Sequence, residues 1–281
     1  MLKKLILLIT LFIPLYSHAD VTSLAPRIVS VDSNATEILL ALELGDHIVA
    51  TDITSQSLLP SAVDNLGYHR TLSAEGLLQT NADWVIGSDH MGPPETLRLL
   101  EKAPLKLVQL ASPTSLDALS GNVMQLGTML AREDLAKALV TDIAQRQKKL
   151  ADTNSSHQLR MVFLLDLGDR GLSQAGTGTT AAALITLLNG NNISTFSGYQ
   201  SVSIEALLSA NPDVILIGQR ADGELDPANL LERYPLLENT RAGTQQQIIG
   251  INAAKLIAGL SLGALDEALR VSALLSASRS P

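Results

Sequence analysis

The sequence contains an internal repeat that constrains its fold more than any other feature. Residues 73–86 align without gaps on residues 203–216, and six of the 14 aligned positions are identical, where about one is expected by chance. A glycine–tyrosine pair precedes each copy, as Gly67-Tyr68 and Gly198-Tyr199. Two lobes of similar structure, one containing each copy, are the simplest explanation of such a repeat.

Each copy of the repeat has the pattern of a capped helix that leads into a buried strand. Ser73 and Ser203 suit the N-cap position of a helix. Glu75 and Glu205 then fall in the first helical turn, where the helix dipole favours negative charge. This helix-start electrostatics is a sufficient structural reason for both glutamates, and the spacing alone demands no other role.

Strand-like and helical segments alternate along most of the chain. The strand-like runs cover residues 27–31, 47–50, 83–87, 105–110, 160–165, 213–218 and 247–251. This alternation predicts an α/β fold with parallel sheets covered by helices. Ligands of such sheets collect at the carboxyl ends of the strands, so we expect two Rossmann-like lobes with a ligand cleft between them.

A long segment in the middle of the chain has helical composition and no strand signal. Within it, residues 133–150 place leucine and isoleucine at helical spacing and predict one long helix, well above the mean helix length of about 11 residues. We expect this helix to join the lobes, although an ordinary surface helix of a single domain has the same pattern. The predicted organisation is an N-terminal lobe, a helical segment that includes this backbone helix, and a C-terminal lobe, at residues 20–114, 115–152 and 153–281.

The first 19 residues have the layout of a secretory signal peptide. Lys3 and Lys4 precede an apolar stretch over residues 5–16, and the small-residue site Ser17-His18-Ala19 follows. A transmembrane anchor is the alternative, but the stretch is shorter than the roughly 20 residues that a spanning helix needs. Because the chain has no cysteine, it cannot carry a lipid-bearing cysteine or a disulfide. We therefore expect an exported protein that is free and soluble after cleavage and is not a lipoprotein.

Charge and motif content exclude several classes of function. The net charge of −8 argues against nucleic acid as a partner. No Gly-x-Ser-x-Gly motif is present, and no serine has a histidine partner suggested by a motif. The histidines also lack the tight spacing of a zinc or manganese site. We expect a binding protein and no enzymatic activity.

Tyr68 is the residue with the most informative chemistry. It lies in the run Gly67-Tyr68-His69-Arg70, and residues two apart in an extended segment point the same way, so Arg70 is expected beside the phenol. A guanidinium there stabilises the phenolate, which is a hard ligand for ferric iron and a known axial ligand of haem. A tyrosine that closes a turn over the helix start is the structural alternative.

The run Gly-Tyr-x-Arg-x-Leu-Ser-Ala-Glu-Gly at residues 67–76 resembles the signature of the haem-binding proteins of bacterial haem-uptake ABC transporters. Agreement extends over nearly the whole mature chain, at residues 27–30, 92–95, 175–179 and 198–207. These proteins belong to the periplasmic binding proteins with two lobes on a helical backbone, an architecture shared with cobalamin and siderophore binders.

The resemblance implies a ligand, a set of partners and a role for four residues. The transported ligand is ferric haem b, with Tyr68 as the axial ligand of its iron and Arg70 as the arginine that hydrogen-bonds the phenolate. Glu75 and Glu205 match the glutamates, one per lobe, that dock onto arginines of the permease. The implied partners are the permease and ATPase of an inner-membrane ABC importer, with an outer-membrane haem receptor upstream.

The second axial position and the cargo stay open. Some relatives have a histidine just after the first strand of the second lobe, whereas residues 164–169 contain none here. His90, in a loop that follows a strand, and Tyr199 are the candidates for a second ligand, and an empty or water-filled second position is the default. A ferric siderophore or cobalamin is the alternative cargo, but anionic siderophores need clusters of arginines, and the predicted cleft segments supply only Arg70 and Arg170.

Overall fold

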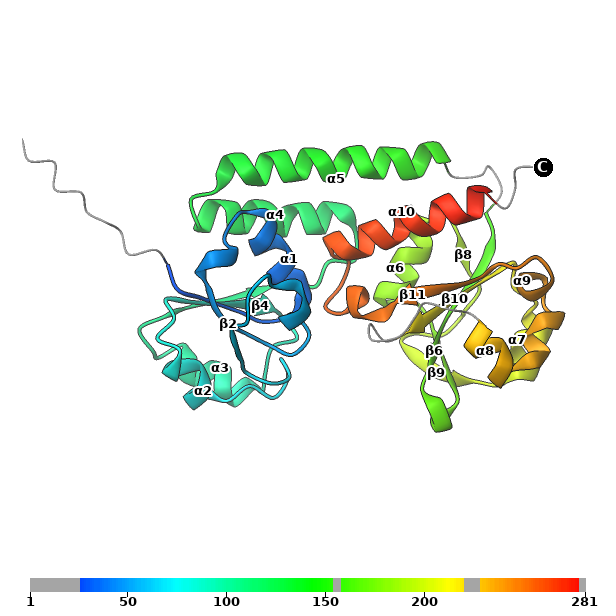
Figure 1. The fold of residues 1–281 in the computed structure, drawn as a ribbon, viewed down its shortest axis with the longest axis horizontal. Helices are drawn as coiled ribbons and strands as arrows, with labels where there is room; N and C mark the ends of the chain where they lie inside the picture. Colours follow the sequence, from blue (N-terminus) through cyan, green and yellow to red (C-terminus); the bar gives the residue numbers. More distant parts are fainter. Residues whose placement is uncertain (1–25, 154–157, 220–227, 278–281) are drawn as a thin grey trace, which may run out of the picture.

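Two α/β lobes lie side by side beneath a long helix in the computed structural model, which describes residues 26–153, 158–219 and 228–277 (Figure 1). The predicted signal peptide lies outside the described residues. Within the described ranges, none of the helices combines the length and the apolarity that crossing a membrane requires.

The N-terminal lobe contains a five-stranded parallel sheet in the order β3-β2-β1-β4-β5. Its strands are β1 (Ile28–Ser30), β2 (Ile48–Thr51), β3 (Asp64–Asn65), β4 (Trp84–Ser88) and β5 (Lys106–Leu110). Its helices are α1 (Ser33–Ala41), α2 (Ala74–Gln79) and α3 (Pro94–Leu100). Ile28 and Ile86 pack in the cluster that contains α1, and Val29 and Val85 pack in the cluster that contains α2 and α3. Both faces of the sheet are therefore covered, which explains the continuous apolar runs of these strands.

The C-terminal lobe contains a mixed sheet in the order β11-β10-β6-β7-β9, with β8 paired to β6. Its strands are β6 (Arg160–Asp166), β7 (Leu172–Ala175), β8 (Asn191–Asn192), β9 (Tyr199–Val202), β10 (Val214–Gln219) and β11 (Ile248–Asn252). Its helices are α6 (Thr180–Leu187), α7 (Ile204–Ala210), α8 (Ala228–Arg233), α9 (Arg241–Thr244) and α10 (Leu262–Ala277). Short 3₁₀ turns occur in both lobes, at Gly45–His47, Gln56–Leu58, Gly168–Arg170, Pro235–Asn239 and Ala253–Leu256.

The prediction of parallel strands is wrong for β7 and β9, which run antiparallel to their neighbours. Only residues 167–171 connect β6 to β7, and Gly168 and Gly171 take positive φ values of 65° and 79° in this short turn. A connection between parallel neighbours needs a dozen or more residues. Because the connection between β6 and β7 is much shorter, it folds back as a hairpin.

The prediction of a long helix that joins the lobes is confirmed by α5 (Glu133–Thr153). At about 1.5 Å per residue, its 21 residues span roughly 31 Å. The preceding helix, α4 (Leu116–Met129), packs closely against it because Gly127 has no side chain, and a Cβ there would lie 2.3 Å from that of Ala136. Figure 1 shows α4 and α10 beneath α5, over the N-terminal and C-terminal lobes respectively. The boundaries of the lobes themselves stay a prediction.

One hydrophobic core continues from lobe to lobe. It includes Ile38 of α1, Ile143 of α5, Phe163 of β6 and Leu265 of α10. Polar contacts reinforce the junction, since Asn34 donates from Nδ2 to the carbonyl oxygens of Ala258 and Leu260, both at 3.1 Å. The two lobes are thus joined by α5 and also by direct contact between α1 and the start of α10.

Candidate functional site

Tyr68 and Arg70 lie in a hydrogen-bonded turn between β3 and α2. The N–H of Thr71 donates to the carbonyl oxygen of Tyr68 at 2.9 Å, and Gly67 enters the turn with a φ of 82°. The segment is therefore not extended, and the prediction that it is extended is wrong. Gly67, which tolerates positive φ without steric cost, allows the chain to reverse just before the helix cap. Both side chains are exposed, and no hydrogen bond joins the Tyr68 hydroxyl to Arg70 in the part of the chain that the structure describes.

The loop after β4 holds this turn in place and brings His90 near it. The N–H of Gly92 donates to the carbonyl oxygen of His69 at 3.0 Å, and the N–H of Leu72 donates to that of Gly92 at 2.8 Å. His90, two residues before Gly92, is half-buried, and its N–H donates to Oγ of Ser88 at 3.2 Å. Tyr68, Arg70 and His90 thus belong to neighbouring loops at the carboxyl edge of the parallel sheet, and a ligand role for His90 stays a prediction.

Tyr199 lies on the other lobe, at the start of the edge strand β9. Its backbone pairs with Ala175 of β7, and its side chain is 45% exposed, the same fraction as for Tyr68. Partial burial of the phenol raises the pKa of Tyr199, which disfavours the phenolate form that a ferric ligand needs. This observation weighs against Tyr199 as a second anionic ligand, and its role stays a prediction.

A buried polar network beneath the Tyr68 turn was missed by the sequence reasoning. The Asp52 carboxylate accepts hydrogen bonds from the N–H of Asp32 at 3.0 Å, from Oγ of Ser55 and Oγ1 of Thr54 at 2.6 Å each, and from Nδ1 of His69 at 3.2 Å. Burial by itself raises the pKa of Asp52, but the hydrogen bonds from His69, Ser55 and Thr54 outweigh it and lower the pKa. The position of Asp32 and Asp52 within two residues of the ends of two neighbouring strands was the available signal, since the carboxyl ends of such strands meet at one edge.

Asp32 is the second buried carboxylate of this network. It caps α1 by accepting from the N–H of Ala35 at 3.0 Å, and it takes a φ of 73°, which is uncommon for a residue other than glycine. Burial raises its pKa to about 6, although hydrogen bonds from Ala35 and Ser88 oppose the increase.

Asp32 is expected to make the protein less stable as the pH rises from about 4 to about 6. Its pKa is higher in the folded chain than in the unfolded chain, so the folded state retains a proton in this window that the unfolded state has released. A shift from 3.8 to about 6 corresponds to about 3 kcal/mol of unfolding free energy, lost as the pH rises through the window. Urea unfolding at a series of pH values measures the unfolding free energy of the wild type and of Asp32→Asn. A difference between the two proteins that does not change with pH contradicts the assignment.

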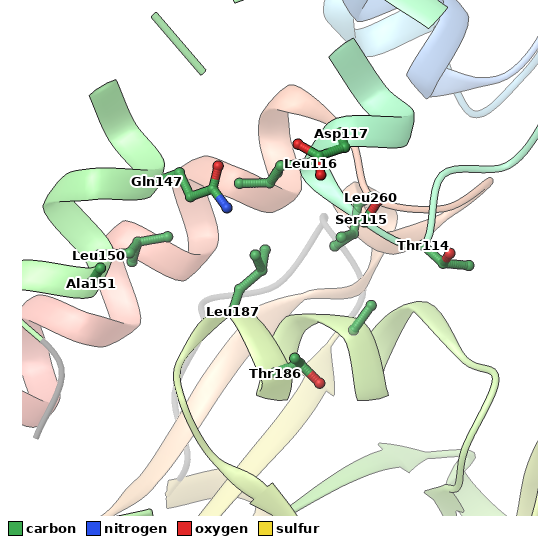
Figure 2. A pocket seen from close by; sticks show the side chains of 11 residues that line it. Thr114, Ser115, Leu116, Asp117, Gln147, Leu150, Ala151, Thr186, Leu187 and Leu260 are labelled. Carbon is green, nitrogen blue, oxygen red and sulfur yellow. The ribbon is translucent and has the colours of Figure 1, made fainter. Parts of the chain in front are cut away.

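A cavity of about 350 Å³ lies where the long helix meets the C-terminal lobe. Figure 2 shows that its walls come from the start of α4, the second half of α5 and the end of α6, with Ser115, Gln147 and Leu187 among them. A second cavity of about 240 Å³ lies beside α2 and the start of β5. Neither cavity is lined by Tyr68, Arg70, His90 or Tyr199.

Four of the six identical positions of the repeat have a structural role in both lobes. Ser73 and Ser203 accept the capping hydrogen bond of their helices from the N–H groups of Gly76 at 3.3 Å and Ala206 at 3.2 Å, so their predicted role is confirmed. Leu77 and Leu207 are buried, and Asn81 and Asn211 have positive φ values in the left-handed region. Asp83 and Asp213 accept hydrogen bonds from the backbone N–H groups of Arg27 and Arg160, respectively.

Glu75 and Glu205 differ from these residues because both side chains are exposed. Each lies in the first turn of its helix, as predicted. Glu75 accepts a hydrogen bond from Gln79 within its own helix at 3.2 Å. Hydrogen bonds from its own N–H and from Ser203 lower the pKa of Glu205, which keeps it ionised. The two copies therefore present equivalent carboxylates to solvent, one on each lobe.

The described residues contain no group of three or more histidine, aspartate or glutamate side chains arranged to hold a metal ion.

A family model described as periplasmic binding protein matches residues 28–254. Among solved structures, the chain is similar to the periplasmic haem-binding protein HutB of Vibrio cholerae, at 32% identity and a TM-score of 0.82 over 89% of this chain and 99% of that one. It is also similar to a periplasmic haem-binding protein from Pseudomonas aeruginosa, at 30% identity and a TM-score of 0.79 over 91% and 94% of the two chains. The vitamin B12-binding protein of Vibrio cholerae is 29% identical over 203 residues, which cover 70% of this chain and 72% of that protein.

Proposed function

The chain belongs to the periplasmic binding protein family, and from that premise we propose that it captures ferric haem in the periplasm through Tyr68 and delivers it to an ABC importer. At the coarser level, it is a binding protein of the cobalamin, haem and siderophore type. Members of this family are substrate-binding transport proteins, so the prediction of a binding protein without enzymatic activity is confirmed.

The observation that carries the proposal is the presentation of Tyr68. The residue is 45% exposed on a turn that is held by backbone hydrogen bonds to the loops after β2 and β4. A phenol fixed on one open edge of a lobe is suited to approach the iron of a large planar ligand from one side. Tyrosine oxygen is an established axial ligand of ferric haem, and it requires no cluster of metal ligands from the protein.

Arg70 supports this role through charge more than through a direct hydrogen bond. It lies two residues from Tyr68 in the same turn, and its exposed side chain has no hydrogen-bonding partner among the described residues. A permanent positive charge near the phenol stabilises the phenolate that iron binding requires. We propose that Arg70 reorients toward the phenolate when haem b is bound, with His90 or Tyr199 near the opposite face of the iron.

Two features support delivery to a transporter. The family implies transfer of the ligand to the permease and ATPase of an ABC importer. Glu75 and Glu205 are exposed and equivalent in the two lobes, and we propose that they dock onto arginines of the permease. Export through the predicted signal peptide, residues 1–19, and an outer-membrane haem receptor upstream belong to the same proposal.

Cobalamin is the second candidate ligand, because the curated relatives that match over most of the chain include a vitamin B12-binding protein. Ligand titrations separate the two candidates. The purified chain without residues 1–19 is titrated with hemin, with cyanocobalamin and with a ferric siderophore, and binding is followed by absorbance and calorimetry. We expect one tight hemin complex that excess cyanocobalamin does not displace. Tight binding of cyanocobalamin or the siderophore, with only weak and non-saturating hemin binding, overturns the proposal.

A further inference from the structure

Within the proposed function, on which this inference rests, we infer that His69 is a positioning residue that fixes the ring of Tyr68 in the orientation that meets the haem iron. His69 is 1% exposed, although Tyr68 and Arg70 on either side of it are exposed. The turn thus sends one of its three side chains into the interior and presents the other two to solvent.

The two aromatic rings of the turn contact each other. The ring centroids of Tyr68 and His69 are 4.2 Å apart, and the ring planes are inclined by 51°. Because nearly half of the Tyr68 side chain is exposed, a buried ring against it limits the directions that the phenol can take. Aromatic pairs at such distances attract each other beyond the effect of burial alone.

The His69 ring is itself fixed to the sheet through Asp52. Nδ1 of His69 lies 3.2 Å from Oδ2 of Asp52, whose other oxygen accepts from the N–H of Asp32 and the hydroxyl of Ser55. Asp52 directly follows β2, and Asp32 lies two residues after the end of β1, so the orientation of the imidazole is tied to two strands of the parallel sheet. A binding group held by such a supporting shell loses less conformational freedom when its ligand arrives.

The unpaired nitrogen of His69 indicates why this residue is not simply a core aromatic. Nε2 is buried and has no hydrogen-bond partner within the described ranges, which is unfavourable for stability. Phenylalanine would occupy the same space without this cost. The property that phenylalanine lacks is the hydrogen bond to Asp52, which fixes the direction of the ring, and this is the property that a positioning role requires.

The test compares His69→Gln, which removes the ring, with a control variant, His47→Gln, at a half-buried histidine outside the Tyr68 turn. The first readout uses the ligand-free protein, in which NMR relaxation of the labelled tyrosine rings reports their order. We expect the Tyr68 ring to become more mobile in His69→Gln while the Tyr199 ring and the His47→Gln protein stay as in the wild type. The second readout is the hemin dissociation rate, which we expect to rise about tenfold in His69→Gln.

Two further variants keep the outcomes separable. His69→Phe retains a buried ring but loses the bond to Asp52, and it should also increase Tyr68 mobility, to a smaller extent; it replaces His69→Gln if that variant does not fold. Tyr68→Phe tests the proposed function itself. Unchanged Tyr68 order and unchanged hemin dissociation in the folded His69 variants overturn the inference and leave the haem proposal intact. Unchanged hemin binding in Tyr68→Phe instead overturns the proposed function.

Discussion

Tyr68→Phe is expected to weaken hemin binding by a hundredfold or more, or about 2.7 kcal/mol, and to abolish the phenolate-to-iron charge-transfer absorption. The substitution keeps the ring and its contact with His69 but removes the oxygen that would bind iron. Replacement of outer-shell partners of metal sites already costs 10–100-fold in affinity, so loss of the ligand itself should cost at least as much. Absorbance titration of both proteins with hemin measures the two effects together.

Tyr234→Phe is the matched control for this experiment. Tyr234 packs against the apolar cluster of the C-terminal lobe. Removal of its hydroxyl group should leave the hemin spectrum and the hemin affinity unchanged. If Tyr68→Phe binds hemin with the wild-type spectrum, Tyr68 is not the iron ligand. In that case His90, on the neighbouring loop, becomes the residue to replace next.

The double substitution Glu75→Ala, Glu205→Ala is expected to reduce haem uptake at least tenfold without changing hemin affinity. Both carboxylates are exposed and neither packs into the fold, so their removal leaves each lobe intact. At an interface with arginines of a permease, each substitution would leave one arginine without its carboxylate partner. An unpaired positive charge is unfavourable when it is buried. Binding of the variant to the transporter in detergent or nanodiscs, and uptake in cells that depend on haem iron, measure the effect.

Glu95→Ala provides the matched control for the docking prediction. Glu95 is exposed in the first turn of α3, on the same lobe as Glu75, and has no counterpart in the repeat. Its removal should leave both hemin affinity and uptake unchanged. Loss of hemin binding in the double variant, or equal loss of uptake in Glu95→Ala, contradicts a specific docking role for the two repeated glutamates.

Much of the fold could be predicted from the sequence because its strongest signals are local and periodic. The apolar runs of β1, β4, β6 and β10 and the helical spacing of α5 are each read within one segment. The repeat added a long-range constraint, since Ser73 and Ser203 cap equivalent helices in the two lobes. The prediction of parallel pairing failed only at one side of the C-terminal sheet, where β7 folds back from β6 in a hairpin with two positive-φ glycines and pairs with β9.

The candidate site was less accessible to sequence reasoning for a physical reason. The bond between Asp52 and His69 joins two loops 17 residues apart, and no periodic pattern reports a contact of that kind. The relation of Tyr68 to Arg70 was predicted for an extended segment, whereas the positive φ of Gly67 and the bond from Thr71 to Tyr68 make the segment a turn. Side-chain direction in a turn is decided by single backbone angles, which residue identity constrains only loosely.

The most direct test of the central claim is a crystal structure of the mature chain with hemin, in which anomalous scattering locates the iron. The account predicts one iron peak within bonding distance of the Tyr68 hydroxyl oxygen, with the porphyrin between the two lobes. An iron peak bound only by other residues, or a porphyrin held in the cavity beside α5 and α6, would contradict it.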